Sequence, residues 1–426
     1  MKDETDTLDA ALAGHILARM GEAGQPPEHG IRHVNVGNEH FLEILRVEYL
    51  DRLLSQSRGS AFKLVQGYYG GGKTHFLYCV RDLAWEKGFL TALVSLSPQE
   101  CPYEDPYLVY RAVAGQVAAA PAGPGLEQTR GIADVLRDLV EEVLLPLPAA
   151  ERAHWLSRSA LRFPVDSHSY RRAAAEFLRC VVEEDREGEL ILEAWLRGDA
   201  VPRSDLRRFG IFETIERPNS FQALRSLCQV LVGYGFPGLV LMFDEADRNL
   251  SISSRRIQAL GDNLRQVIDL CGASQLPGVL FLYAVPPEFL RLVVPEYPAL
   301  DQRLRSPVPM SRHSPQAALI DLEQMSLGTE SLLEGIGTKL LAVFKAAYDW
   351  EPTLAIQQGN LQALARASAR FSLEIGHRRH FVKTWVAFLQ QQRLRGESWL
   401  SDEGAEALLS QGFLAASSDD QDFSDV

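Results

Sequence analysis

The residues with the clearest chemical signature lie between Gly67 and Thr74, in the segment Gly-Tyr-Tyr-Gly-Gly-Gly-Lys-Thr. This segment fits the phosphate-binding pattern G-x-x-x-x-G-K-[ST]. Glycines let successive backbone N–H groups point into one anion-sized hollow, and the N-terminus of the following helix adds partial positive charge. The segment therefore predicts a nucleoside triphosphate site; the alternative is a flexible glycine linker between two apolar segments. The residues expected to contact the nucleotide are Gly67, Gly70, Gly71, Gly72, Lys73, Thr74 and His75.

Lys73 and Thr74 have distinct predicted roles. Lys73 is expected to reach the β- and γ-phosphates and so to act in catalysis, and the Thr74 hydroxyl is expected to ligate Mg²⁺. The flanking residues support such a loop, because a strand-like run at 61–66 precedes it and a helix is predicted to open at Lys73. Apolar residues repeat on one face of that helix, and Gly88 is a plausible stop.

A second pair of chemical residues, Asp244 and Glu245, follows the apolar run 239–243. A buried strand of a parallel sheet would deliver both acids to its carboxyl end, which is the edge at which ligands bind. There the Asp244 carboxylate can support Mg²⁺ directly or through water, and Glu245 can polarise the attacking water as a general base. This is the Walker B pattern; the alternative is two solvated acids after a strand.

The elements that must position these residues follow from hydrophobic periodicity. Apolar runs predict further strands at 90–96 and 279–284, and 320–325 is a candidate fifth strand, so the expected fold is a parallel α/β sheet flanked by helices. Tyr283 is the one polar residue inside the 279–284 strand, and it is either a γ-phosphate sensor or a core aromatic. Helical patterns are predicted at 8–20, 41–54, 106–119, 131–145, 170–184, 221–232, 253–270, 330–350, 361–369 and 380–394.

The order of these elements suggests four parts of the chain. An N-terminal helix and linker are expected at 1–29, and a P-loop ATPase core at 30–325 that contains a helical insertion at about 97–220. A helical lid is expected at 326–398. The remaining segment, 399–426, ends in an acidic tail that we expect to be disordered.

Composition limits the expected partners and cellular location of the protein. The formal net charge of −13 gives no global attraction to nucleic acid or to an acidic membrane surface, although a local basic patch could still bind DNA. The 5 cysteines are scattered without a C-x-x-C pair, which favours a reducing cytoplasm and argues against structural zinc. The N-terminus is too polar and acidic for a signal peptide, and no apolar run approaches the ~20 residues of a membrane span.

Taken together, the motifs and their order resemble an AAA+-type (ASCE-like) P-loop ATPase, closest to the origin-initiator branch. The finer sequence is similar to one family. The stretch 67–77, with its helix opening on His75-Phe76-Leu77, resembles the G-x-Y-G-x-G-K-[ST]-H-F-L loop of the ATP-binding proteins of BREX phage-defence systems. The stretch 233–245 resembles that family's second motif, and the chain length resembles that of its smaller members.

The resemblance implies roles for residues outside the two motifs. Arg303 and Arg305 stand where AAA+ proteins keep an arginine finger, and the alternative is a solvated basic turn. Arg378 or Arg379 stands where a lid arginine meets the γ-phosphate, and the alternative is an exposed helix start. Val36-Gly37 would lie near the adenine.

The resemblance also implies a setting for the protein: a cytoplasmic ATPase beside helicase-like, methyltransferase or phosphatase-like defence components. Its cofactors would be ATP and Mg²⁺, and an arginine finger would join subunits of a homo-oligomer. The motifs favour a hydrolysing nucleotide-driven switch or motor. The alternatives are a non-hydrolysing ATP-gated scaffold and, with less support, a P-loop kinase.

Overall fold

The computed structural model describes residues 8–97, 100–121, 130–245, 254–273, 275–292, 294, 301–302, 304, 308–324, 327–370 and 376–410. Contacts between backbone positions divide the chain into two compact units. Neither unit is continuous in sequence. The first unit comprises Met1–His40, Gly67–Cys79 and Asp321–Val426, and the second comprises Phe41–Gln66 and Val80–Ile320. The four consecutive parts expected from the sequence remain a prediction.

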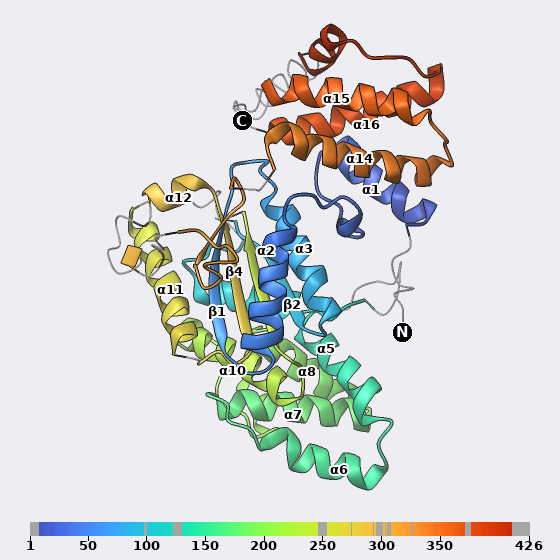
Figure 1. The fold of residues 1–426 in the computed structure, drawn as a ribbon. Helices are drawn as coiled ribbons and strands as arrows, with labels where there is room; N and C mark the ends of the chain where they lie inside the picture. The colour runs from blue at the N-terminus through green and yellow to red at the C-terminus, as the bar shows by residue number, and fades with distance from the viewer. Residues whose placement is uncertain are drawn as a thin grey trace. The chain divides into compact units, whose positions relative to one another are not determined.

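The second unit is built on a sheet of five strands in the order β2-β3-β4-β1-β5. The pairs β2–β3, β3–β4 and β4–β1 are all parallel, as predicted. An α/β fold with a parallel sheet flanked by helices is therefore confirmed (Figure 1). The strands are β1 (Ser60–Gln66), β2 (Leu90–Ser95), β3 (Leu239–Asp244), β4 (Val279–Val285) and β5 (Leu319–Asp321).

Three strands, β3, β4 and β1, lie inside the sheet. Every residue of β3 and β4 is buried, as expected of parallel strands covered on both faces. The predicted fifth strand is shorter than the 320–325 run. In the structure β5 holds three residues at the sheet edge, Leu319–Asp321.

Helices of the second unit cover the sheet and extend into the predicted insertion. In Figure 1, α11 lies beside β1, and the insertion helices α5 to α8 gather at one end of the sheet. The elements that precede or follow these strands along the chain are α2 (Glu39–Ile44), the π-helix η2 (Leu45–Leu54), α3 (Lys73–Glu86), α4 (Pro106–Gln116), α10 (Ser220–Gly233), α11 (Ser254–Gly272) and α12 (Pro287–Leu292).

The insertion is helical, as predicted, but it holds more helices than periodicity indicated. The expected helices correspond to α5 (Ile132–Leu139), continued by η3 (Val140–Leu144), and to α7 (His168–Glu183). The unpredicted ones are α6 (Ala149–Ser157), η4 (Ser159–Leu161), α8 (Arg186–Leu196), α9 (Arg203–Arg207) and η5 (Arg217–Asn219). α8 is fixed to its neighbours by the Arg137 guanidinium of α5, which pairs with Glu189 and Glu193.

In the first unit, four helices form one group: α1 (Ala10–Glu22), α14 (Thr329–Tyr348), α15 (Leu354–Arg370) and α16 (His377–Arg395). Figure 1 shows α1 beside α14, and α1 packs against α14 and, less extensively, against α16. The buried Trp385 indole donates to the Gly337 carbonyl at 3.0 Å and joins α16 to α14. The predicted helix at 361–369 was too short, because α15 already begins at Leu354.

Two further findings concern the described residues alone. None of their helices is long and apolar enough to cross a membrane. All five cysteines are buried, and no disulfide joins any two of them.

Candidate nucleotide site

The loop at 67–72 has the conformation that its glycines were expected to provide. It follows β1 directly, and helix α3 opens at Lys73 as predicted, with the Phe76 N–H donating to the Gly72 carbonyl at 2.9 Å. Gly70 and Gly72 have φ angles of 73° and 94°, which L-amino acids with side chains rarely adopt. The segment is therefore an ordered strand-to-helix turn and not a flexible linker.

Lys73 is held against the start of the loop. Its ammonium donates to the Gly67 carbonyl at 3.0 Å and to the Tyr68 carbonyl at 3.2 Å, and the residue is only 8% exposed. An ammonium has three donors, so two bonds fix its position and one donor remains for a phosphate oxygen. This geometry fits the role predicted for Lys73.

His75 connects the loop helix to the N-terminal segment of the first unit. Its Nε2 lies 3.0 Å from Asn35 Oδ1, which also accepts from Asn38 Nδ2 at 3.2 Å. The Lys339 ammonium of α14 donates to the Asn35 carbonyl at 2.5 Å. Burial, and to a smaller extent the charge of Lys339, lower the pKa of His75 to about 4, so the imidazole is neutral at pH 7.

The same network fixes the segment predicted to lie near adenine. Gly37 has a φ of 89°, and Val36 packs so closely on α14 that a Cβ at Gly335 would come 2.7 Å from its Cγ1. In this structure the His75 side chain contacts Asn35. Contact of Val36, Gly37 or His75 with the nucleotide remains a prediction.

Both lid arginines lie against the loop. Arg378 Nη1 donates to the Gly71 carbonyl at 2.8 Å, and Arg378 Nη2 pairs with Glu323 at 3.0 Å. The Arg379 guanidinium lies 5.3 Å from the ring centroid of Tyr69, an exposed aromatic residue of the loop. Arg378, at 17% exposed, is not a solvated helix start. Contact of either arginine with a γ-phosphate remains a prediction.

Sequence reasoning missed Glu323, Asn35 and Lys339. A signal existed for Glu323, because Asp321 and Glu323 alternate with apolar residues at the end of a predicted strand. Asn35 and Lys339 gave none, since a lone amide or lysine is ordinary surface usage.

The acid pair lies in the second unit, at the carboxyl end of a buried strand as the sequence predicted. Asp244 is the last residue of β3, is 5% exposed and pairs in register with Ser95 of β2. Glu245 follows with a φ of 60°, and its N–H donates to Asp244 Oδ1 at 2.9 Å. A left-handed backbone costs a residue with a side chain about 1 kcal/mol or more, and such positions cluster at functional sites.

The sheet register brings the end of β3 near the end of β1. Phe243 pairs with Tyr283 of β4, and Ala284 pairs with Val65 of β1, so the two strands end at the same level of the sheet. One strand separates them, and neighbouring strands are 4.7–4.9 Å apart, so Asp244 lies about 10 Å across the sheet from the end of β1. Both parts of the predicted site thus follow carboxyl ends of parallel strands.

The predictions for Tyr283 and for the arginines at 303 and 305 have different outcomes. The Tyr283 ring is fully buried among Tyr103, Phe243 and Phe289, and among the described residues its hydroxyl has no hydrogen-bond partner. Tyr283 is therefore a core aromatic, which was one of the two readings. Arg303 and Arg305 lie outside the described residues, and their role as arginine fingers stays a prediction.

The donors proposed for Mg²⁺ have suitable chemistry. A threonine hydroxyl and a carboxylate are the hard oxygen ligands that Mg²⁺ takes, with water filling its other positions. No cluster of three or more His, Cys, Asp or Glu with the geometry of a metal site occurs among the described residues. A site of one hydroxyl and one carboxylate would not form such a cluster.

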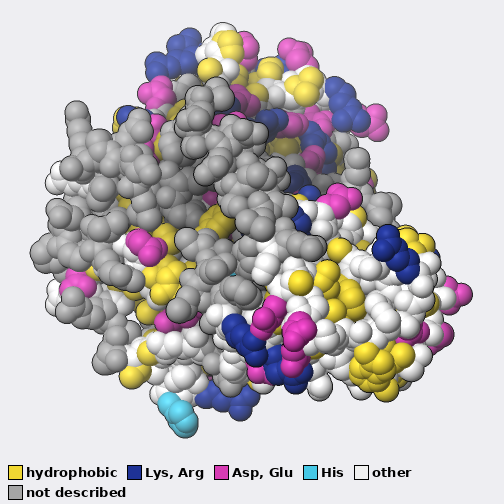
Figure 2. All heavy atoms as spheres, turned by 90° about the horizontal axis from the view of Figure 1, so that it is seen from above, with side chains coloured by type: hydrophobic (Ala, Val, Ile, Leu, Met, Phe, Trp, Pro, Cys, Tyr) yellow, Lys and Arg dark blue, Asp and Glu magenta, His cyan; other side chains and the backbone are white. Residues whose placement is uncertain are grey.

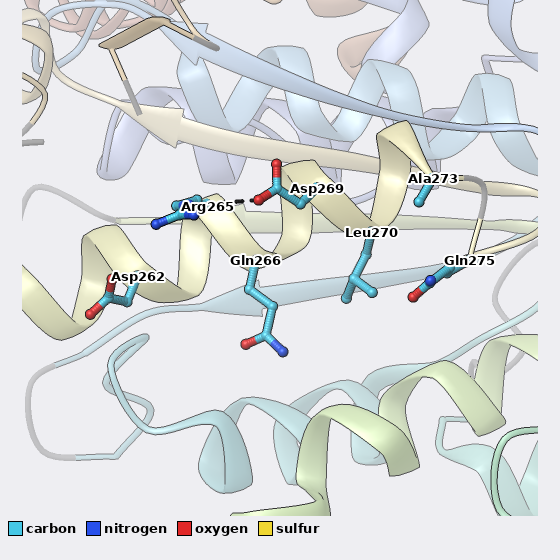
Figure 3. A pocket seen from close by; sticks show the side chains of 7 residues that line it. All are labelled: Asp262, Arg265, Gln266, Asp269, Leu270, Ala273 and Gln275. Carbon is cyan, nitrogen blue, oxygen red and sulfur yellow. Dashed lines mark ion pairs between the residues drawn. The ribbon is translucent and has the colours of Figure 1, made fainter. Parts of the chain in front are cut away.

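One pocket of about 400 Å³ is formed along α11 and the loop after it (Figure 3). Figure 3 shows Arg265 paired with Asp269, at 3.6 Å, on its wall. The lining includes neither a residue of the 67–74 loop nor Asp244. This pocket is therefore not the predicted nucleotide site.

The fold and these residues together define a class of protein. A parallel sheet with a phosphate-loop sequence after β1 and an acid pair after β3, with β4 between those strands, is the arrangement of a P-loop NTPase fold.

Within that class, the chain belongs to the family described as BREX system ATP-binding protein BrxC/D, whose family model matches residues 11–397. Among solved structures, the chain is similar to the ORC2 protein of Aeropyrum pernix, determined as ADPNP–ADP complexes. The identity is 13% and the TM-score 0.43, over 88% of this chain and 67% of that one. No curated protein matches the chain.

Proposed function

We propose that this protein binds ATP with Mg²⁺ and hydrolyses it, and that it acts as a nucleotide-driven switch or motor within a BREX defence system. The observation that carries the proposal is that a phosphate-loop sequence follows β1 while a buried carboxylate and a glutamate with a left-handed backbone come at the end of β3 in the same parallel sheet. The family's description as ATP-binding supports the choice of nucleotide.

Each residue has a stated part in the reaction. The loop N–H groups and the Lys73 ammonium bind the phosphates, and Lys73 stabilises the charge that develops on the γ-phosphoryl group. Thr74 and Asp244 would hold Mg²⁺, which neutralises phosphate charge when bound. Glu245 accepts a proton from the attacking water; its backbone conformation is fixed by the bond from its N–H to Asp244.

The proposal includes subunit coupling and partners. Arg303 or Arg305 would complete the site of a neighbouring copy, and other components of the defence system would respond to the nucleotide state. DNA is not favoured as a partner by the net charge of −13. On the face shown in Figure 2, basic and acidic side chains of the described residues are interspersed, and no broad basic area is visible there.

The test compares ATP binding and phosphate release in the purified full chain and two variants. Lys73→Ala removes the phosphate-binding ammonium, and we expect it to abolish ATP binding. Glu245→Gln keeps the side-chain shape and removes the base, so binding should persist while turnover falls about 100-fold or more. Unchanged phosphate release by Glu245→Gln would remove the catalytic assignment.

A non-hydrolysing ATP-gated scaffold is the second candidate. The burial of Tyr283 in the core favours it, since Tyr283 was the polar candidate for a sensor on β4 and it faces other aromatic side chains. A scaffold would bind ATP and show no phosphate release by the wild-type protein, with DNA or partner proteins present or absent.

A further inference from the structure

An ion pair spans one turn of the phosphate loop. Glu323 Oε1 accepts from the Tyr68 N–H at 3.2 Å, and the other carboxylate oxygen pairs with Arg378 at 3.0 Å. Arg378 in turn donates to the Gly71 carbonyl at 2.8 Å. The pair therefore holds the first and last residues of the 68–71 turn through their backbone groups.

The turn that this pair holds is closed on itself. The Gly71 N–H donates to the Tyr68 carbonyl at 2.9 Å. A phosphate loop binds its anion through backbone N–H groups that point at the ligand. In this conformation a carboxylate occupies the N–H of Tyr68, and a carbonyl of the loop occupies the N–H of Gly71. Two donors of the loop are thus already bonded to acceptors within the protein.

The close approach of Glu323 and Gly376 to the loop is possible because positions 70 and 71 are glycines. A Cβ on Gly71 would lie 2.7 Å from Glu323 Oε1, and a Cβ on Gly70 would lie 3.0 Å from the Cα of Gly376, the residue before α16. Both charged side chains are shielded, with 17% of Arg378 and 27% of Glu323 exposed. A shielded pair with backbone partners is stronger than a fully exposed surface pair.

Arg378 also retains a donor. Its Nε is buried and has no hydrogen-bond partner among the described residues. A buried donor without an acceptor is unfavourable, so a phosphate oxygen that reached the guanidinium would relieve it. The Glu323 carboxylate, by contrast, is destabilised when a polyanion enters the loop, because like charges are then brought together.

We propose that Glu323 is a positioning residue that keeps the phosphate loop closed through Arg378, and that a nucleoside triphosphate opens the 68–71 turn by taking Arg378 from Glu323. This inference rests on the proposed function of the loop and adds its regulation. The γ-phosphate adds charge next to both side chains, so ATP competes with Glu323 more effectively than ADP does.

The test measures the Kd of a fluorescent ATP analogue and of its ADP counterpart for the wild-type chain, Glu323→Gln and a matched control, Glu330→Gln. Glutamine keeps an acceptor for the Tyr68 N–H but removes the charge. We expect Glu323→Gln to bind the ATP analogue about three- to tenfold more tightly, in keeping with the loss of one shielded charge pair. Binding of the ADP analogue should change less, and the exposed Glu330 should have no effect.

The outcomes separate this inference from the proposed function. Weaker or unchanged binding of the ATP analogue by Glu323→Gln would overturn it, since the pair would then support the binding conformation or be irrelevant to it. Equal changes in the Kd of the ATP analogue and of the ADP analogue would also overturn the inference. If Lys73→Ala bound ATP as well as wild type, the proposed function itself would fail, whatever the Glu323 result. Thermal unfolding of both glutamate variants without nucleotide checks that they fold.

Discussion

The neutral state of His75 gives a prediction that can be worked through quantitatively. Its pKa is lowered to about 4 in the folded protein, from an ordinary value of 6.5, by burial and by the Lys339 charge. Below pH 6.5 the unfolded chain therefore binds a proton that the folded chain does not accept. Stability from this group is complete above pH 6.5 and is lost as the pH falls from 6.5 toward 4.

The magnitude follows from the pKa difference. One pH unit within this window corresponds to about 1.4 kcal/mol, so lowering the pH from 7 to 5.5 should remove about 1 kcal/mol of unfolding free energy through His75. His75→Gln keeps a donor in place of Nε2 for Asn35 but cannot titrate. The variant should therefore lose about 1 kcal/mol less than wild type over the same pH step.

Urea unfolding of both proteins at pH 7 and 5.5 measures this difference, because the other titrating groups contribute equally to each. His154→Gln, at an exposed position on α6, is the matched control variant. Identical pH dependence in wild type and His75→Gln would refute the reasoning. In that case the imidazole would be solvated or already charged.

The remaining predictions concern packing and the loop. Gly238→Ala should destabilise the protein by more than about 2 kcal/mol in urea unfolding, since its Cβ would lie 2.1 Å from the Gly278 carbonyl oxygen. Gly115→Ala, in helix α4 with nothing within 4 Å of the new Cβ, should instead stabilise it by up to about 1 kcal/mol. Gly71→Ala should clash with Glu323, weaken the Arg378 contact and so change the affinity of the loop for ATP. An ATP affinity equal to that of wild type would show that the close approach of Gly71 to Glu323 has no role.

Predictions from the sequence were most accurate where the local backbone or its burial requires a particular type of residue. The glycines at 70 and 72 adopt the backbone angles that the phosphate-loop pattern demands, and the buried run ending at Asp244 is an inner strand of the sheet. These features are local, so a short window of sequence contains them.

Predictions were less complete where distant segments meet. The bonds of Glu323 to Tyr68 and Arg378 join residues 255 and 55 positions away, and no local periodicity specifies such contacts. The insertion helices α8 and α9 were also missed. In α8, Glu189 is buried against Arg137 of another helix, which obscures the amphipathic pattern. α9 has five residues, too few for a helical period to show in the sequence.

The most direct test of the central claim is a crystal structure with a non-hydrolysable ATP analogue and Mn²⁺, with the metal located by its anomalous signal. The account predicts one nucleotide whose triphosphate is enclosed by the backbone at 67–74. The metal should bond to the Thr74 hydroxyl and lie within one water of Asp244. A nucleotide bound elsewhere, or a metal more than about 10 Å from Asp244, would contradict it.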